Sequence, residues 1–184
     1  MIIGIPKEIM HGERRVSATP ETVGKFVKDG MAVLVEKSAG EASFFHDSQY
    51  AAAGARIVED CAELYKEAEV ILKVKEPQFN SGKNCHEIDL MHKGQYLITF
   101  IHPASPGNHE MVRAMADKGI IGLTLDGIPR ISRAQNMDAL TSMSTCAGYK
   151  GMLIAADRLT KFMPQIFCAA GMIRPVNALV IGAG

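Results

Sequence analysis

Short apolar runs recur along the first 125 residues, separated by segments in which apolar and polar residues alternate at helical spacing. Each run is four to seven residues long and rich in isoleucine, valine and leucine. Such runs are typical of strands that are buried on both faces of a sheet. They predict six strands, at residues 2–5, 31–36, 55–58, 70–74, 96–101 and 119–125.

Helical segments lie between these strands. Thr19 followed by Pro20 predicts the start of a helix that closes near Gly30. Further helices are predicted at residues 48–53, 61–67 and 108–118. Strands joined by single helices imply right-handed crossovers. We therefore predict an α/β fold with a doubly wound, mostly parallel sheet of the Rossmann or flavodoxin type, in which ligands meet the carboxyl ends of the strands.

The pattern changes near residue 134. One long helix is predicted from Gln135 to about Phe162, ended by Pro164. Small residues recur along it at three- and four-residue steps, which is typical of a face packed against another domain or subunit: Ser144, Ala147, Gly148, Gly151 and Ala155. The final apolar run, 175–184, predicts a strand that enters a GxG turn at Gly182 and Gly184, the opening of a dinucleotide phosphate loop.

These changes predict three parts: an amino-terminal catalytic domain at residues 1–133, a connecting helix at 134–163, and the first strand of a nucleotide-binding Rossmann domain at 175–184. Residues 78–92 are polar and are expected to form a solvated loop. The two histidines of this loop, His86 and His92, are six residues apart. Their spacing and polar surroundings predict no metal site.

Composition narrows the classes of function. The 184 residues are 47% hydrophobic, enough for a domain with its own core. The 20 basic and 20 acidic residues are dispersed, which indicates no nucleic-acid or anionic membrane partner. No apolar run approaches the ~20 residues that span a bilayer, and no signal peptide is indicated, so we expect a cytoplasmic location. The cysteines, Cys61, Cys85, Cys146 and Cys168, lack metal-ligand spacing, and Cys146 is expected to be a small buried thiol.

A polar loop at the entrance of the long helix carries the densest candidate chemistry. Arg130 leads into the helix, and Gln135, Asp138 and Thr141 are spaced to share one helical face. A guanidinium, an amide, a carboxylate and a hydroxyl aimed together suit a carboxamide and a ribose. A simpler interpretation accounts for part of the loop, because Ser132 and Gln135 have the spacing of a capping box.

Three strand ends carry further candidates. Arg15 follows the first strand, Lys75 the fourth and His102 the fifth. Each has an ordinary explanation: a solvated basic pair with Arg14, a snorkelling lysine beside Lys73, and a structural histidine. Lys73 and Lys75 are expected to point the same way from an extended chain. If the three side chains converge on one crevice, Arg15 and Lys75 can clamp a carboxylate while His102 exchanges a proton, as in an oxo-acid or amino-acid dehydrogenase.

The run PRISRAQ, followed by Asp138 and a segment that ends in AGY at Tyr149, resembles the signature loop of the NAD(H)-binding alpha subunit of proton-translocating NAD(P) transhydrogenase, which belongs with alanine dehydrogenase. The resemblance implies that NAD is the cofactor and that Thr141 keeps a hydroxyl where the family usually has serine. The cofactor-binding residues that it implies are Arg130, Gln135, Asp138, Thr141, Met143, Ser144, Tyr149, Gly182 and Gly184.

The runs MIIGIPKEI, ERRVSATP, AGE and LKVKEP resemble the amino-terminal domain that alanine dehydrogenase shares with the transhydrogenase alpha subunit. The resemblance implies that Arg15, Lys75 and His102 match the substrate pocket of alanine dehydrogenase. The lysine and the histidine are typically not kept in transhydrogenase. The chain therefore joins an alanine-dehydrogenase-like pocket to a transhydrogenase-like nicotinamide loop.

Three hypotheses follow. The first is the amino-terminal part of a transhydrogenase alpha-subunit-like protein, with NADP(H) on a partner subunit and a peripheral place on the membrane through those partners. The second is an alanine or related amino-acid dehydrogenase that acts on a small-molecule substrate. The third is a non-catalytic fragment that dimerises or regulates. We expect a homo-oligomer, a dimer or higher. Without a complete phosphate loop the chain alone is expected to bind NAD poorly and to be inactive.

Overall fold

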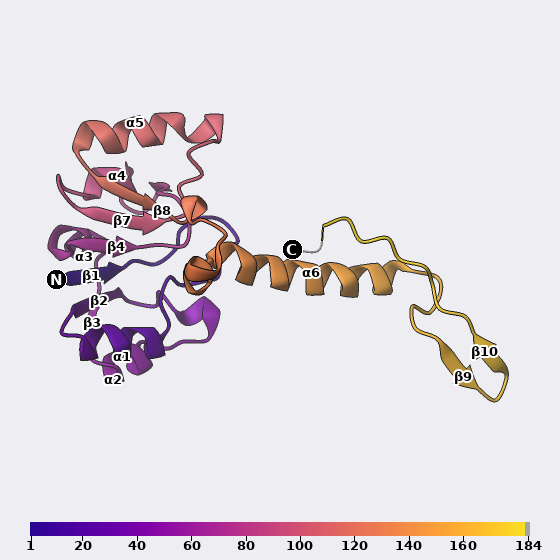
Figure 1. The fold of residues 1–184 in the computed structure, drawn as a ribbon. Coiled ribbons are helices and arrows are strands. Elements are labelled where there is room, and N and C mark those ends of the chain that lie inside the picture. Colours follow the sequence, from indigo (N-terminus) through magenta and orange to yellow (C-terminus); the bar gives the residue numbers. More distant parts are fainter. Residues whose placement is uncertain (183–184) are drawn as a thin grey trace. The chain divides into compact units, whose positions relative to one another are not determined.

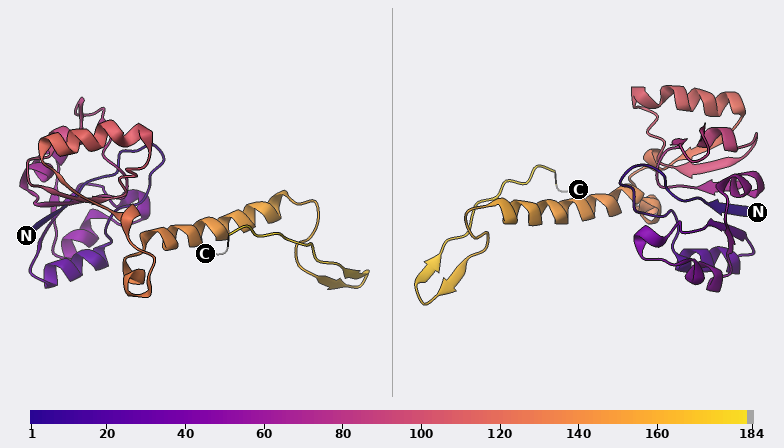
Figure 2. Two further views of the ribbon diagram at one scale, coloured as in Figure 1. Left: turned by 45° about the horizontal axis from the view of Figure 1, so that its top comes forward. Right: turned by 180° about the vertical axis from the view of Figure 1, so that it is seen from behind.

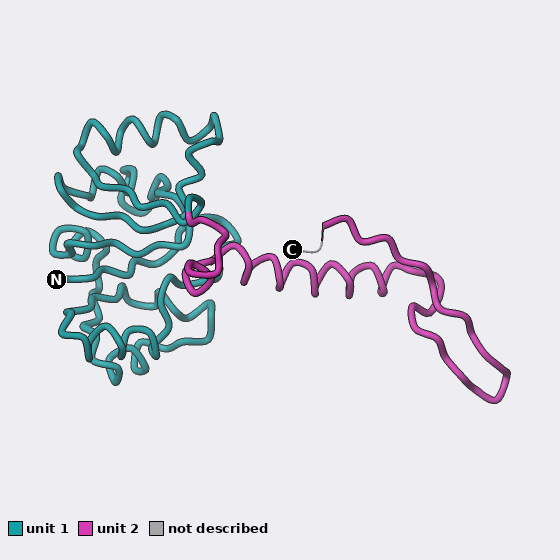
Figure 3. The backbone as a smooth tube through the Cα atoms, in the orientation of Figure 1, with its two compact units in different colours: residues 1–127 teal, residues 128–184 magenta. Residues whose placement is uncertain are grey.

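The computed structural model describes residues 1–182, which form two compact units, Met1–Gly127 and a second unit from Ile128 onward. Figure 3 colours the two units separately. The first unit is built on a six-stranded sheet (Figure 1). Its strands are β1 (Ile2–Ile5), β2 (Ala32–Glu36), β3 (Arg56–Val58), β4 (Val70–Leu72), β7 (Tyr96–Thr99) and β8 (Ile121–Thr124).

The strand order is β3-β2-β1-β4-β7-β8, and every neighbouring pair is parallel. This order confirms the predicted doubly wound sheet. The chain proceeds outward from β1 in one direction and from β4 in the other, so the order reverses between these two strands. In open α/β sheets a ligand crevice forms at this reversal, outside the carboxyl ends of the strands.

Helices cover both faces of the sheet, and Figure 2 gives two further views of them. The helices of the first unit are α1 (Pro20–Lys28), α2 (Asp47–Ala52), α3 (Cys61–Glu67), α4 (Glu87–Leu90) and α5 (His109–Lys118). Val23 of α1 and Tyr50 of α2 share one hydrophobic cluster with Ile3 and Ile5 of β1. The helices α3, α4 and α5 contribute to a second cluster. Short 3-10 turns complete the unit: η1 (Glu41–Ser43), η2 (Pro106–Asn108) and η3 (Leu125–Gly127).

Residues 78–92 form a structured segment, so the prediction of a solvated loop is wrong. The small hairpin of β5 (Phe79–Asn80) and β6 (Cys85–His86) leads directly into α4. Glu87 is only 2% exposed and Met91 likewise 2%. The burial of this segment is hard to predict from the sequence because one of the residues that enter the core is a glutamate, Glu87, which forms an ion pair with the buried Lys73.

The second unit begins with a 3-10 helix, η4 (Ser132–Met137), and continues into α6 (Ala139–Arg158). The long helix therefore starts later and ends earlier than the helix predicted at residues 135–162. Asp138 accepts hydrogen bonds from the backbone N–H groups of Leu140 and Thr141, both at 3.0 Å. This carboxylate is the N-cap, and the predicted capping box at Ser132 does not form, since η4 has no side-chain cap.

An antiparallel hairpin of β9 (Ile166–Cys168) and β10 (Gly171–Ile173) follows α6. Residues 175–182 pair with no strand in the described part of the chain. Because a strand needs a neighbour for its hydrogen bonds, the predicted nucleotide-binding strand at 175–184 stays a prediction. Gly182 has a φ of 86°, a left-handed conformation that suits glycine in a turn, and Gly184 lies outside the described residues.

The helix α6 has no buried residue within the described chain. Cys146, which was expected to be buried, lies on this helix and is exposed. No helix among residues 1–182 has both the length and the apolar character needed to cross a bilayer.

Candidate functional site

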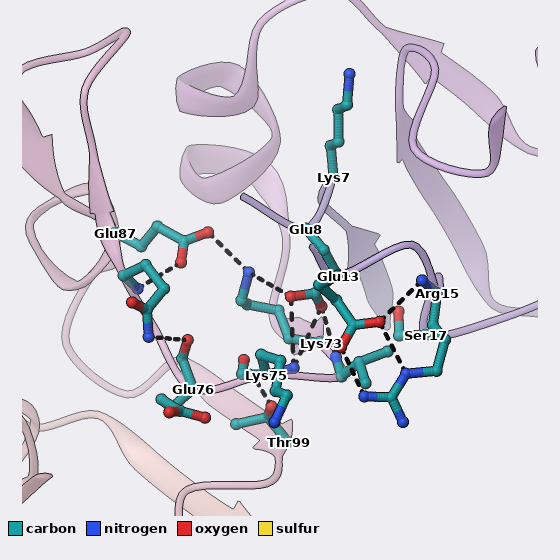
Figure 4. Close-up of polar contacts among 12 residues, drawn as sticks. Lys7, Glu8, Glu13, Arg15, Ser17, Lys73, Lys75, Glu76, Glu87 and Thr99 are labelled. Atoms are coloured by element: carbon teal, nitrogen blue, oxygen red, sulfur yellow. Dashed lines mark hydrogen bonds and ion pairs between the residues drawn. The ribbon is translucent and has the colours of Figure 1, made fainter. Parts of the chain in front are cut away.

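The loop after β1 presents a guanidinium held by a carboxylate. Arg15 donates through Nε to Glu13 Oε1 at 2.8 Å and through Nη2 to Glu13 Oε2 at 2.6 Å (Figure 4). This fork geometry fixes the plane of the guanidinium. The hydrogen bonds from Arg15 are the main reason that the pKa of Glu13 falls to about 2. Arg14 is exposed, and its carbonyl accepts a hydrogen bond from the Ser43 hydroxyl at 2.6 Å.

The two lysines after β4 do not point the same way, contrary to the prediction. β4 ends at Leu72, and the chain bends at Val74 and Lys75 instead of continuing as an extended strand. Lys73 is buried, at 2% exposure. Lys75 is half-buried and lies close enough to Glu13 to lower the pKa of that carboxyl, after the larger effect of Arg15. The structure therefore brings Arg15 and Lys75 together around Glu13 at the reversal between β1 and β4.

His102, in the loop after β7, forms a pair with Asp126, which follows β8. The His102 Nδ1 atom lies 2.7 Å from Asp126 Oδ1, and the His102 backbone N–H donates to Asp126 Oδ2 at 2.8 Å. The Thr124 hydroxyl donates to the same oxygen at 2.6 Å. Partial burial acts to raise the pKa of Asp126, but the hydrogen bonds from Thr124 and His102 outweigh it and the pKa lies below its usual value.

This pair lines a cavity of about 350 Å³. The Phe100 ring stacks on the imidazole with a centroid distance of 5.8 Å. A carboxylate on Nδ1 orients the imidazole and leaves Nε2 as the atom that can exchange a proton with a ligand. The arrangement therefore suits His102 to general acid–base chemistry.

Sequence reasoning missed the two carboxylates that hold these groups. Asp126 directly follows the sixth predicted strand, and a position directly after a strand is the same signal that pointed to His102. Glu13 lies two residues before Arg15, within reach of its side chain. No group of His, Cys, Asp and Glu side chains in the described part of the chain is arranged to hold a metal ion.

The polar loop before α6 encloses a separate cavity of about 820 Å³. It brings together the four residues that the sequence singled out there, with their neighbours: Pro129, Arg130, Ile131, Ser132, Gln135, Asp138, Thr141 and Ser142. The Thr141 hydroxyl donates to Asp138 Oδ2 at 2.6 Å. This hydrogen bond, followed by those from the Thr141 and Leu140 backbone and the nearby Arg130 charge, lowers the pKa of Asp138.

The donors and acceptors of this cavity fit a nicotinamide and its ribose. The Arg130 guanidinium and the Gln135 amide can bind a carboxamide, and the Asp138 carboxylate keeps acceptor capacity beyond its capping bonds. The other predicted cofactor residues that the structure describes are absent from the cavity lining. Ser144 donates its hydroxyl to Leu140 O at 2.9 Å, and Tyr149 is 71% exposed. Met143 lies on the same helix and is half-buried.

Comparisons with known proteins place these features in a family. Residues 4–147 match the protein-family model described as alanine dehydrogenase/PNT, N-terminal domain. The chain belongs to this family. Over its full length it is 38% identical to an NAD(P) transhydrogenase subunit alpha from Cereibacter sphaeroides, covering 34% of that protein. It is 34% identical over its full length to an alanine dehydrogenase from Methanococcus maripaludis, covering 48% of that protein.

The fold of this alanine dehydrogenase/PNT domain is also similar to that of a solved transhydrogenase from Sinorhizobium meliloti. The two superpose with a TM-score of 0.82 at 36% sequence identity, over 95% of this chain and 50% of the other. The chain thus spans between a third and a half of the length of the relatives it matches. Family members of both names are NAD(P)-dependent oxidoreductases, which supports a nicotinamide nucleotide as the cofactor of the family.

Proposed function

We propose that the chain is the amino-terminal part of a transhydrogenase alpha-subunit-like oxidoreductase, in which hydride passes between NAD(H) and NADP(H). The loop before α6 holds the nicotinamide end of NAD(H), with Arg130 and Gln135 on the carboxamide and Asp138 on the ribose. NADP(H) is held by a partner subunit. Bound NAD(H) supplies or accepts the hydride, and the residues of this chain orient its ring.

The observation that most supports this proposal is the convergence of Arg130, Gln135, Asp138 and Thr141 on one cavity. The full-length similarity to a transhydrogenase alpha subunit agrees with it. The wider assembly is proposed on the same basis: a homo-oligomer joined to NADP-binding and membrane subunits, with a peripheral place on the membrane.

The test uses the complete polypeptide that carries this sequence, assembled with its partner subunits. Hydride transfer from NADH to an NADP⁺ analogue of distinct absorbance is measured for wild type and for Arg130→Ala. Loss of a charged hydrogen-bonding group should reduce the rate by about 10- to 100-fold. Arg133→Ala is the matched control, because Arg133 lies three residues after Arg130, within η4, and is absent from the cavity lining. Equal losses in both variants would contradict the proposal.

A second candidate function is alanine or amino-acid dehydrogenation. The observation that favours it is the placement of Arg15, Lys75 and the His102–Asp126 pair at the carboxyl edge of one sheet. Arg15 and Lys75 would bind a substrate carboxylate, and His102 Nε2 would accept or return the proton of the amino or hydroxyl group at the reacting carbon.

Reduction of NAD⁺ by L-alanine, measured on the same complete polypeptide, tests this candidate. His102→Gln should reduce the rate by about 10²- to 10⁴-fold because it removes the acid–base group. His109→Gln, at the start of α5, is the matched control. Activity between the two nucleotides without any alanine-dependent activity would exclude the dehydrogenase.

A further inference from the structure

Two buried carboxylates hold the segment that follows β4, residues 73–78. The backbone N–H of Val74 donates to Glu8 Oε1 at 2.6 Å. The backbone N–H of Gln78 donates to Glu87 Oε2 at 2.8 Å. Glu8 comes from the loop after β1 and Glu87 from the first turn of α4, so the segment is gripped from two separate parts of the chain.

Lys73 joins the two carboxylates. Its Nζ atom lies 2.9 Å from Glu87 Oε1 and 3.4 Å from Glu8 Oε2. All three side chains are buried, at 0% exposure for Lys73, 3% for Glu8 and 2% for Glu87. The Tyr65 hydroxyl donates to Glu87 Oε1 at 2.8 Å and completes the network, part of which is visible in Figure 4.

Stability alone does not require this network. Buried ion pairs lose much of their attraction to desolvation, and apolar residues of similar volume often serve as well or better. Burial indeed raises the pKa of Glu8 in spite of the neighbouring Lys73. What apolar residues cannot do is accept hydrogen bonds from the backbone of the segment that leaves the sheet.

Lys75 stands at the centre of the held segment. Its backbone N–H lies 3.4 Å from both Glu8 oxygens, and its carbonyl accepts a hydrogen bond from the Thr99 hydroxyl at 2.9 Å. The peptide groups on both sides of its Cα atom are therefore fixed, by Glu8 on one side and by Thr99 on the other. Its ammonium lies near enough to Glu13, the partner of Arg15, for its charge to lower the pKa of that carboxyl.

We propose that Glu8, Lys73 and Glu87 are positioning residues for Lys75. They fix the backbone of residues 73–78 so that the Lys75 ammonium is presented beside Arg15, and they touch no substrate themselves. The proposal deepens the second candidate function and rests on it only for the role of Lys75 in binding a carboxylate.

The first experiment measures amide hydrogen exchange by NMR on the chain of residues 1–184. In Glu8→Ala the exchange at Val74 and Lys75 should accelerate by about tenfold or more, because a charged acceptor is lost. Glu8→Gln should retain much of the protection, since its amide oxygen still accepts. Lys73 keeps Glu87 as its partner in both variants.

Glu36 provides the matched control. It is a second carboxylate at the same sheet edge, its pKa is raised chiefly by burial, and it accepts the Lys7 backbone N–H at 2.8 Å. Glu36→Ala should accelerate exchange at Lys7 and leave Val74 and Lys75 unchanged. If Glu8→Ala leaves both amides protected, or if Glu36→Ala loosens them equally, the positioning role is overturned.

The second experiment uses pyruvate as the probe. Lysines are reductively methylated with a ¹³C label, and the Lys75 signal, assigned with Lys75→Arg, is followed during titration. Glu8→Ala should weaken pyruvate binding by about tenfold and Glu8→Gln by less, while Glu36→Ala keeps the wild-type affinity. If pyruvate does not shift the wild-type Lys75 signal, the carboxylate-binding function fails, and the exchange rates alone then decide the positioning role.

Discussion

Gly4, in the centre of β1, allows α3 to approach the sheet closely. A Cβ atom at this position would lie 2.7 Å from Leu64 Cδ2 and 2.8 Å from Ala68 Cβ. We predict that Gly4→Ala destabilises the first unit by about 1–3 kcal/mol through overpacking. Urea unfolding measures the change. Gly24→Ala in α1 is the control, because its Cβ would meet only Ala53 Cβ at 4.0 Å, and it should stabilise by about 1 kcal/mol.

The Glu13–Arg15 pair predicts a dependence of stability on pH. The folded pKa of Glu13 is about 2, below the ordinary 4.5, chiefly because of the hydrogen bonds from Arg15. A lowered carboxyl pKa contributes stability that is fully present above pH 4.5 and is lost as pH falls toward 2. ¹³C NMR of the Glu13 carboxyl measures its pKa directly. Arg15→Gln should return it toward the ordinary value, whereas Arg14→Gln should leave it near 2; an unchanged pKa in Arg15→Gln would contradict the pairing.

At the scale of elements, Asp138 has two roles that its variants can separate. It caps α6 through Leu140 and Thr141, and we propose that it also contacts the ribose. Asp138→Ala should accelerate amide exchange at residues 140 and 141 by about fivefold, from a loss of about 1 kcal/mol of capping energy. Asp138→Asn should preserve the helix, since asparagine also caps, while removing the charge. Ser142→Ala serves as the control, because the Ser142 hydroxyl donates to Ala139 O in the same first turn and does not bind Asp138 in the described part of the chain. Faster exchange in this control would show that the effect is not specific to the cap.

The elements that the sequence predicted well are those whose signals are local. β1 and α3 have the predicted bounds. An apolar run defines β1, and α3 is defined by its N-cap Asp60 and by one buried helical face. The start of α6 was missed because two residues, Ser132 and Asp138, compete to cap it, and their spacing does not reveal which hydroxyl or carboxylate reaches the backbone.

In the candidate site, too, residues with a local signal in the sequence could be predicted and residues without one could not. The positions of Arg15, Lys75 and His102 after strands could be predicted from the sequence, because the carboxyl ends of parallel strands meet at one edge; their roles in a site stay predictions. It did not find Glu87, which reaches Lys73 from 14 residues further along the chain. Contacts of that kind depend on how the segment after β4 folds back, and no periodic pattern in the sequence encodes them.

At the scale of the whole molecule, the two hydrophobic clusters consist entirely of residues from the first unit. A core that is complete within one unit predicts that this unit folds without the rest. A chain ending at Gly127 should therefore unfold in urea with the same midpoint and the same slope as the transition of the first unit in the full chain. A loss of more than about 1 kcal/mol, which is a change of about fivefold or more in the folding equilibrium, would instead show that residues beyond Gly127 complete the core.

The shortened chain also separates the two candidate sites. It retains the Glu13–Arg15 and His102–Asp126 pairs and lacks the cavity lined by Arg130 and Gln135. Its Glu13 should still titrate with a pKa of about 2, and its Lys75 signal should still respond to pyruvate if that pocket binds carboxylates. Loss of both responses with the fold intact would mean that residues beyond Gly127 are needed to shape the carboxylate pocket, and it would tie the chemistry at the sheet edge to the nicotinamide loop.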